Sequence, residues 1–249
     1  MIYIKNSQEI DYMREAGRIV GETLLMLKDI IKPGITTAEI DKIAEEFITK
    51  QGAKPSFKGY GGFPATLCIS INDQVVHGIP GKTVLKDGDI VTLDCGALIN
   101  GFHGDAARTY AVGNISDEAA KLIKVTEESF FKGIEKAVIG NRLTDISHEI
   151  QEYVEANGFS VVRDFVGHGI GKSLHEDPEV PNFGRSGRGP KLVEGLVLAI
   201  EPMVNIGGFH VRTKQDGWTV VTADGSLSAQ YENTVVITPD GPEILTLVK

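Results

Sequence analysis

The sequence predicts a mixed α/β (α+β) fold, arranged as a pseudo-twofold repeat of two helices followed by antiparallel strands. Three observations support this prediction. Apolar residues recur at helical spacing in four segments, and short apolar runs bounded by turn residues follow each pair of segments. The second half of the chain also repeats the first at a nearly constant offset. We expect one domain over residues 1–249, with repeats at about 7–112 and 116–249.

The first repeat starts with a pair of helices. A stripe of apolar residues at three- and four-residue spacing predicts a helix over residues 7–31, with Ser7 as its N-cap. Thr36 and Glu39 have the spacing of a capping box, which predicts the start of a second helix. Gly52 is expected to close this helix.

The strands of the first repeat carry two acidic residues. Strands are expected over residues 66–71 and 74–77, joined as a hairpin, and then over residues 90–94. This last strand is apolar until Asp94, and the strand after the following glycine-flanked turn carries Asp105. Either acid alone could face solvent at a strand end. Together they suggest a shared cation, because a buried carboxylate needs a cation or several donors.

The second repeat supplies a counterpart to Asp94. Helices are predicted over residues 116–138 and 144–156, and the remainder of the chain is rich in strands. The apolar strand that ends in Asp94 matches the apolar strand that ends in Glu201, 107 residues later. If the halves pack around a pseudo-twofold axis, these two carboxylates converge. They then repel each other unless one is protonated or a cation lies between them.

A glycine-flanked histidine lies in the second half. The stretch around His168 superficially resembles a phosphate-binding loop, but Val166 and Lys172 stand where the P-loop and dinucleotide patterns need glycine. Gly167 and Gly169, on either side of the histidine, allow the backbone to approach a ligand closely.

A candidate set of metal ligands follows from these positions and from one more acid in a largely apolar strand: Asp94, Asp105, His168, Glu201 and Glu232. Four carboxylates and one imidazole suit divalent ions such as Mn, Fe, Co or Zn. This is too much negative charge for one divalent ion, so the set predicts a two-metal site. No Gly-x-Ser-x-Gly motif for a nucleophilic serine is present in the sequence.

Composition and charge restrict the class of protein. The net charge of −9 argues against nucleic-acid binding as the main role, and the basic residues Arg185, Arg188 and Lys191 are expected in a solvated loop. Cys68 and Cys95 lie in apolar strand-like runs, which indicates reduced cysteines. The early polar N-terminus and the absence of a long apolar run predict neither a signal peptide nor a membrane span. We therefore expect a cytoplasmic protein.

The most specific motifs are Gly167–Gly171 with His175, the Asp94/Asp105 pair, Glu201-Pro202-Met203 and Ser228–Glu232. On these motifs, and over essentially its whole length, the sequence resembles type I methionine aminopeptidases of the short bacterial form. The resemblance implies a single catalytic domain with the pita-bread fold, a curved antiparallel sheet with helices outside. Only 25 residues separate His175 from Glu201, where type II relatives carry a large insertion. We also expect no N-terminal zinc-binding extension of the kind found in eukaryotic type I forms.

The resemblance implies a role for each candidate metal ligand. Asp94 would chelate the second metal, Asp105 and Glu232 would bridge both metals, and His168 and Glu201 would hold the first. The two divalent ions would be drawn from Co, Mn, Fe, Zn and Ni.

The resemblance also implies the reaction and its catalytic residues. A hydroxide bridging the metals would remove the N-terminal methionine from nascent proteins and peptides with a small second residue. His77 would lie near the substrate amine and the scissile bond, His175 would donate to the carbonyl oxygen as charge develops, and Glu201 would move a proton to the leaving amine. The expected partners are nascent polypeptides with a free N-terminal methionine. Transient ribosome contact and a monomeric state are further expectations.

By motif position, the methionine pocket would be formed by Tyr60, Phe63, Cys68 and Trp218, with Phe57 and Leu174 at its rim. Several family members have Tyr at position 63, Cys at 57 and Phe at 174, so this chain departs from them at three pocket positions. Without the resemblance, a hydrophobic core beneath a loop would be the preferred interpretation of this aromatic cluster.

Two alternatives share the same fold. X-Pro dipeptidases and aminopeptidases have the same ligands but usually carry an additional N-terminal domain, whereas the first repeat here begins by Ser7. A non-catalytic pita-bread protein would act as a binding module. Such proteins lose metal ligands, whereas all five are present in this sequence.

Overall fold

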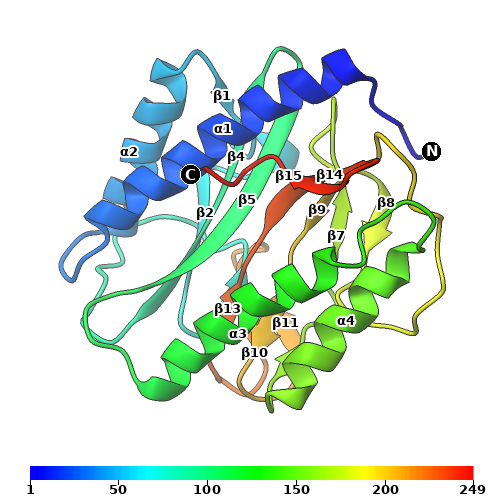
Figure 1. Cartoon of the computed structure of the whole chain (residues 1–249). Helices are drawn as coiled ribbons and strands as arrows, with labels where there is room; N and C mark the ends of the chain where they lie inside the picture. Colours follow the sequence, from blue (N-terminus) through cyan, green and yellow to red (C-terminus); the bar gives the residue numbers. More distant parts are fainter. Residues whose placement is uncertain (249) are drawn as a thin grey trace.

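The structure is a computed structural model that describes residues 1–248 (Figure 1). Within this range the chain forms four α-helices: α1 Ser7–Ile30, α2 Thr37–Lys50, α3 Asp117–Ile134 and α4 Leu143–Ala156. A short 3-10 turn, η1, covers Tyr60–Gly62.

Strands follow each pair of helices along the chain. Those of the first half are β1 Lys54–Pro55, β2 Leu67–Ile71, β3 Gln74–Val76, β4 Ile90–Ile99 and β5 Phe102–Ala111. Those of the second half are β6 Ser160–Val161, β7 Gly167–Gly169, β8 Glu176–Val180, β9 Val197–Ile200, β10 Met203–Asn205, β11 Val211–Thr213, β12 Val220–Thr222, β13 Ser228–Gln230, β14 Asn233–Thr238 and β15 Gly241–Ile244. The predicted alternation of helix pairs and strands is confirmed.

Two helix ends differ from the prediction. The N-cap of α1 is Asn6 and not Ser7, because the Asn6 side chain accepts from the Glu9 backbone N–H and Glu9 reaches back to the Asn6 N–H. This is a capping box, which stabilises the helix start more fully than a single serine bond. Helix α3 stops at Ile134 instead of residue 138, since the chain then turns through short-range backbone bonds such as Ala137 N–H to the Ile134 carbonyl. The capping box of α2 at Thr36 is confirmed.

A long hairpin of β4 and β5 forms the centre of the first half. Strand β4 continues past Asp94 to Ile99, so the prediction that this strand ends at Asp94 was wrong. The turn lies at Asn100 and Gly101, both with positive φ (53° and 80°), as expected for a tight hairpin. Strands β1 and β2 pair one after the other with the edge of β4 opposite β5. Helix α1 packs on β4 and β5 over an apolar core that α2 completes.

Strand β3 belongs to a different ladder from the expected one. It pairs with β12 of the second half, whereas the sequence predicted a β2–β3 hairpin. The chain does turn after Ile71, and the Ile69 N–H donates to the carbonyl of Gly78. This arrangement carries the segment that ends in His77 across to the second half.

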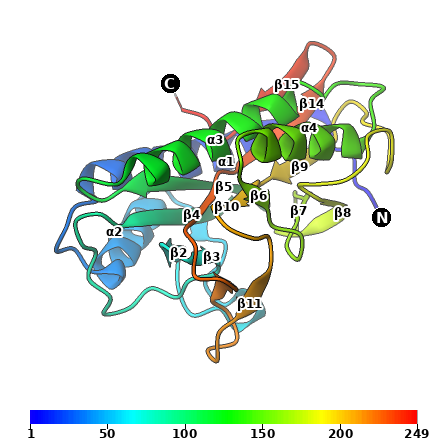
Figure 2. The same ribbon diagram turned by 90° about the horizontal axis from the view of Figure 1, so that it is seen from below.

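The second half repeats the plan around its own core. Five of its strands form a sheet in the order β15-β14-β9-β7-β8, and α3 and α4 pack against each other and on this core. In Figure 2, α1, α3 and α4 lie along one side of the molecule, whereas β3 and β11 lie on the other. None of the helices in residues 1–248 is long and apolar enough to span a membrane.

The halves meet where β5 lies beside β14. Ala107 and Glu232 exchange two backbone hydrogen bonds, and the Thr234 hydroxyl bonds both the N–H and the carbonyl of Asp105. These bonds fix the two acid-bearing segments side by side, so the interface between the repeats is also where the candidate ligands converge.

Candidate metal centre

Asp94 and Asp105 lie on one face of the β4–β5 hairpin. Asp105 is paired with Gly96, and Asp94 lies two residues before that glycine. Because side chains alternate along a strand, the two carboxylates are diagonal neighbours on the same face. The Asp105 side chain is buried, which holds its carboxylate away from bulk water.

Glu201 and Glu232 occupy the ends of two paired strands. Strand β9 stops at Ile200 and β14 starts at Asn233, and these two residues are paired in register. Glu201 therefore follows one member of the pair and Glu232 precedes the other. The Gln230 side-chain amide donates to Glu201 Oε2 at 3.3 Å.

His168 lies on β7 with its ring turned toward the acids. Its Nε2 is 3.9 Å from Asp105 Oδ2 and 3.7 Å from Glu201 Oε1. Its Nδ1 lies 2.8 Å from the Gly169 carbonyl oxygen, which can only accept a hydrogen bond. Nδ1 therefore carries the proton, and Nε2 presents its lone pair to the carboxylates. A Cβ at Gly167 or Gly169 would clash with neighbouring backbone oxygens at 2.3 and 2.1 Å, so both glycines permit this close packing.

Without a bound cation, burial makes the ionised carboxylates and a protonated His168 unfavourable in this cluster. Burial raises the pKa of Asp94 to about 7 and raises the pKa of Asp105, Glu201 and Glu232 well above their usual range, with mutual repulsion adding to the last three. Burial lowers the pKa of His168 to about 3. A positive ion in the cluster would reverse the penalty on the carboxylates.

Unpartnered oxygens test whether a cation fits. Buried oxygens of Asp94, Asp105 and Glu232 have no hydrogen-bond partner within the described part of the chain. Ligand atoms of Asp105, His168 and Glu232 lie within 4.8 Å of one another. Buried acceptors without donors, together with a free imidazole nitrogen, form a suitable ligand set for divalent cations.

His77 and His175 lie beside the cluster. The His175 ring centroid is 4.2 Å from that of His168, and its Nδ1 is 2.8 Å from the Tyr60 hydroxyl. Burial lowers the pKa of His175 and lowers that of His77 to about 4. His77 has a φ of 59°, an uncommon backbone conformation for a residue other than glycine that often occurs at functional sites.

One cavity of about 220 Å³ contains the whole candidate site. It is lined by all five candidate ligands, by both histidines, and by every predicted pocket and rim residue: Tyr60, Phe63, Cys68, Trp218, Phe57 and Leu174. The Phe63 and Trp218 rings pack edge to face at 5.2 Å. Four lining residues were not predicted: Val76, Phe165, Val166 and Met203. Each lies next to or within a predicted motif or beside a predicted residue, and this proximity in sequence could have indicated them.

The chain is similar to known metallopeptidases. Residues 11–239 match the model of metallopeptidase family M24. The methionine aminopeptidase of Clostridium perfringens is 74% identical over 249 residues, which cover all of both chains. The crystal structure of methionine aminopeptidase from Thermotoga maritima superposes with a TM-score of 0.98 at 48% identity, covering 100% of each chain.

The prolidases, which are the alternative enzyme class, are similar to this chain in fold but have much lower sequence identity. Prolidase from Pyrococcus furiosus has a TM-score of 0.81 and 24% identity, and the match covers 99% of this chain but 66% of that one. The pita-bread architecture predicted from the sequence is confirmed by these structures. The chain therefore belongs to metallopeptidase family M24 and, within it, to the methionine aminopeptidases.

Proposed function

We propose that this chain removes the N-terminal methionine from nascent proteins and peptides with a small second residue, using two divalent metal ions. One observation carries the proposal: a single cavity combines five convergent ligands with an apolar, aromatic wall. The long, unbranched methionine side chain suits such a wall, because its flexible thioether contacts aromatic rings favourably. The full-length relatives support the same activity.

Each candidate ligand has a proposed place. Asp94 would hold the second metal, Asp105 and Glu232 would be shared by both, and His168 and Glu201 would hold the first. When bound, divalent cations lower the pKa of water and polarise the scissile carbonyl. The ions are drawn from Co, Mn, Fe, Zn and Ni, since mixed carboxylate and imidazole ligands suit these metals.

The protein's own groups move and hold the protons. When the Tyr60 hydroxyl donates to His175 Nδ1, the proton of this neutral imidazole sits on Nε2, which can donate to the carbonyl oxygen as charge develops. When a bound cation keeps its carboxylate ionised, Glu201 can take a proton and deliver it to the leaving amine. His77 is neutral at pH 7 and can hydrogen-bond near the substrate amine.

The substrate needs a free N-terminal amine, which explains the release of a single residue. We propose that one catalytic domain spans residues 1–249, and that it acts as a cytoplasmic monomer on nascent polypeptides, with transient ribosome contact. The net charge of −9 supports a role without specific nucleic-acid or membrane binding.

The test is hydrolysis of matched peptides by purified protein supplied with Mn, Fe or Co. We expect release of methionine from Met-Ala-Ser, little release from Met-Leu-Ser, and loss of both after treatment with a chelator. Cleavage of X-Pro peptides in place of Met-Ala-Ser would instead support a prolidase-like enzyme. Binding of Met-Ala-Ser without turnover in all three metals would support a non-catalytic binding protein.

A further inference from the structure

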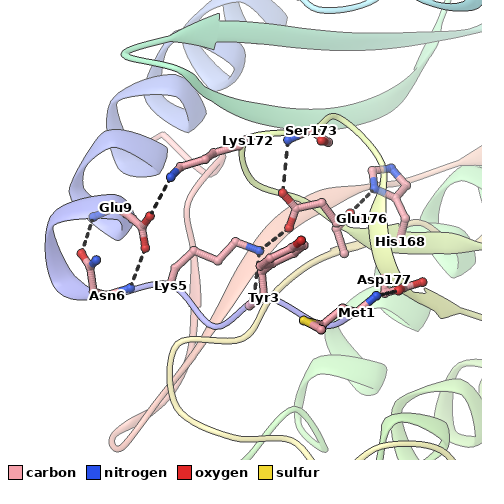
Figure 3. Close-up of polar contacts among 11 residues, drawn as sticks. Met1, Tyr3, Lys5, Asn6, Glu9, His168, Lys172, Ser173, Glu176 and Asp177 are labelled. Atoms are coloured by element: carbon pink, nitrogen blue, oxygen red, sulfur yellow. Dashed lines mark hydrogen bonds and ion pairs between the residues drawn. The ribbon is translucent and has the colours of Figure 1, made fainter.

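A buried ion pair lies directly beside His175. Lys5 Nζ is 2.7 Å from Glu176 Oε2, and the two side chains are only 4% and 7% exposed (Figure 3). Every other pair between a Lys or Arg and an acid in residues 1–248 has at least one side chain that is much more exposed. Exposed pairs contribute little, whereas a buried pair is costly to break.

Glu176 also organises the turn that carries His175. Its Oε1 accepts a hydrogen bond from the backbone N–H of Ser173 at 3.1 Å, which closes the turn over residues 173–176 (Figure 3). Its other oxygen faces Lys5. Both carboxylate oxygens are therefore engaged, one with the histidine-bearing turn and one with the N-terminal segment.

Lys5 is itself fixed to the second half. Its backbone N–H donates to the Gly195 carbonyl at 2.8 Å, and the preceding Ile4 forms a bridge with Leu196 just before β9. Its Nζ also donates to the Tyr3 carbonyl at 3.2 Å. The cation is thus anchored to the segment leading into β9, the strand that ends before Glu201.

Two glycines make room for the pair. A Cβ at Gly171 would lie 2.6 Å from Lys5 Cε and 2.7 Å from Glu176 Oε1. A Cβ at Gly195 would lie 2.4 Å from the Lys5 carbonyl oxygen. The last glycine of the Gly167–Gly171 motif therefore admits this ion pair, a role separate from the packing around His168.

We propose that Lys5 and Glu176 are positioning residues for His175, holding its turn so that the imidazole reaches the scissile carbonyl. This inference rests on the proposed function. The His175 ring contacts Tyr60, which is half exposed, and the His168 ring, whereas the ion pair supplies a buried anchor for the turn. A shift of about 1 Å in a reacting group is enough to slow catalysis by roughly 100-fold.

The experiment compares Lys5→Met, Glu176→Gln and the double variant with wild type, using Arg14→Met/Glu243→Gln as the control. The control removes an exposed tertiary pair between α1 and β15. We expect each single variant to lose about 10- to 100-fold in kcat on Met-Ala-Ser, with KM and bound metal unchanged. The control should match wild type.

The double variant guards against misfolding, because it leaves no buried charge unpaired. We expect it to fold and to lose about tenfold in kcat, since the tie between the segments is absent. In metal-free protein, the NMR signal of the His175 ring, identified with His175→Ala, should shift in this variant but not in the control.

Wild-type kcat in a folded double variant, or an unshifted His175 signal, would overturn the inference. Loss of bound metal equal to the loss of kcat would also overturn it, because the pair would then support the metal cluster and not His175. These results differ from a failure of the proposed function, in which the wild-type protein itself does not cleave Met-Ala-Ser.

Discussion

The two halves of the molecule supply their candidate metal ligands in different ways. The first half supplies two aspartates from the interior of an uninterrupted hairpin, ten residues on each strand. The second half supplies two glutamates from points where strands break, after β9 and before β14, and a histidine from the short β7. The two halves therefore differ in how the candidate ligands are held.

The lengths of the acidic side chains correspond to this difference in backbone structure. A continuous ladder fixes each Cα of the hairpin, so the short side chains of Asp94 and Asp105 lie at defined positions on one face. At a strand break the backbone turns away, and the longer side chains of Glu201 and Glu232 restore the reach. The β4–β5 hairpin of the first half therefore provides a rigid base for the site, and the second half adds the imidazole of His168.

Removing that imidazole should have the largest effect. His168→Ala is expected to weaken metal binding and reduce methionine release to background, because it removes the one imidazole of the candidate ligand set. Metal content and turnover would be measured together. His148→Ala is the matched control, since its Nδ1 also contacts a glycine carbonyl, that of Gly184 at 3.2 Å, away from the cavity. An active His168→Ala enzyme would refute the ligand role.

His175→Ala tests the one proposed proton donor that is not a ligand. Loss of a single donor to a developing oxyanion costs about 10²- to 10³-fold in kcat, and we expect a loss of this size. Metal content should stay at the wild-type level. If the metal is lost as well, His175 is a ligand and its assignment as a donor is wrong.

Lengthening one acid tests the rigidity of the hairpin. Asp105→Glu keeps the charge but adds a methylene on a Cα that the ladder and Thr234 hold fixed. We expect turnover to fall by about 100-fold, the scale of a misplacement of about 1 Å. Asp73→Glu, in the turn before β3, should be neutral. Full activity in Asp105→Glu would show that the hairpin adjusts and is not a rigid base.

The smallest expected effect is the change with pH in the free energy of unfolding of the metal-free protein. Above about pH 7.5 the histidines with lowered pKa are almost fully neutral in the folded and unfolded states, so they add little slope. The carboxylates with raised pKa, including Asp94 at about 7, still bind protons in the folded state alone. Metal-free protein should therefore lose roughly 1–2 kcal/mol of stability between pH 7.5 and 8.5.

Thermal unfolding in a chelator would measure this loss, and saturating metal should abolish it by favouring the ionised carboxylates. Asp94→Asn should reduce the slope, because it removes one of the groups that ionise. A metal-free protein that becomes more stable over this range would contradict the raised pKa values.

Several elements could be predicted because their signals are local. The helices follow from apolar periodicity and capping residues, and the Thr36 box is visible within four positions. The offset of 107 residues between the repeats indicates, from the sequence alone, that Asp94 and Glu201 occupy equivalent positions. Strand partners were harder, since hydrogen bonding to β12 depends on a segment far from β3 in the chain. A sequence window cannot show which distant edge is free.

The sequence by itself determined the chemical types of the site: carboxylates at matching places in two repeats, and a histidine between glycines. Only the tertiary structure decided how these groups meet. It placed Asp105 against the Glu232 segment, and it paired Lys5 with Glu176 across 171 positions. The reason is physical. Residue type fixes which proton or metal a group can hold, whereas burial and distance, which set its pKa and its partners, exist only after the chain has folded.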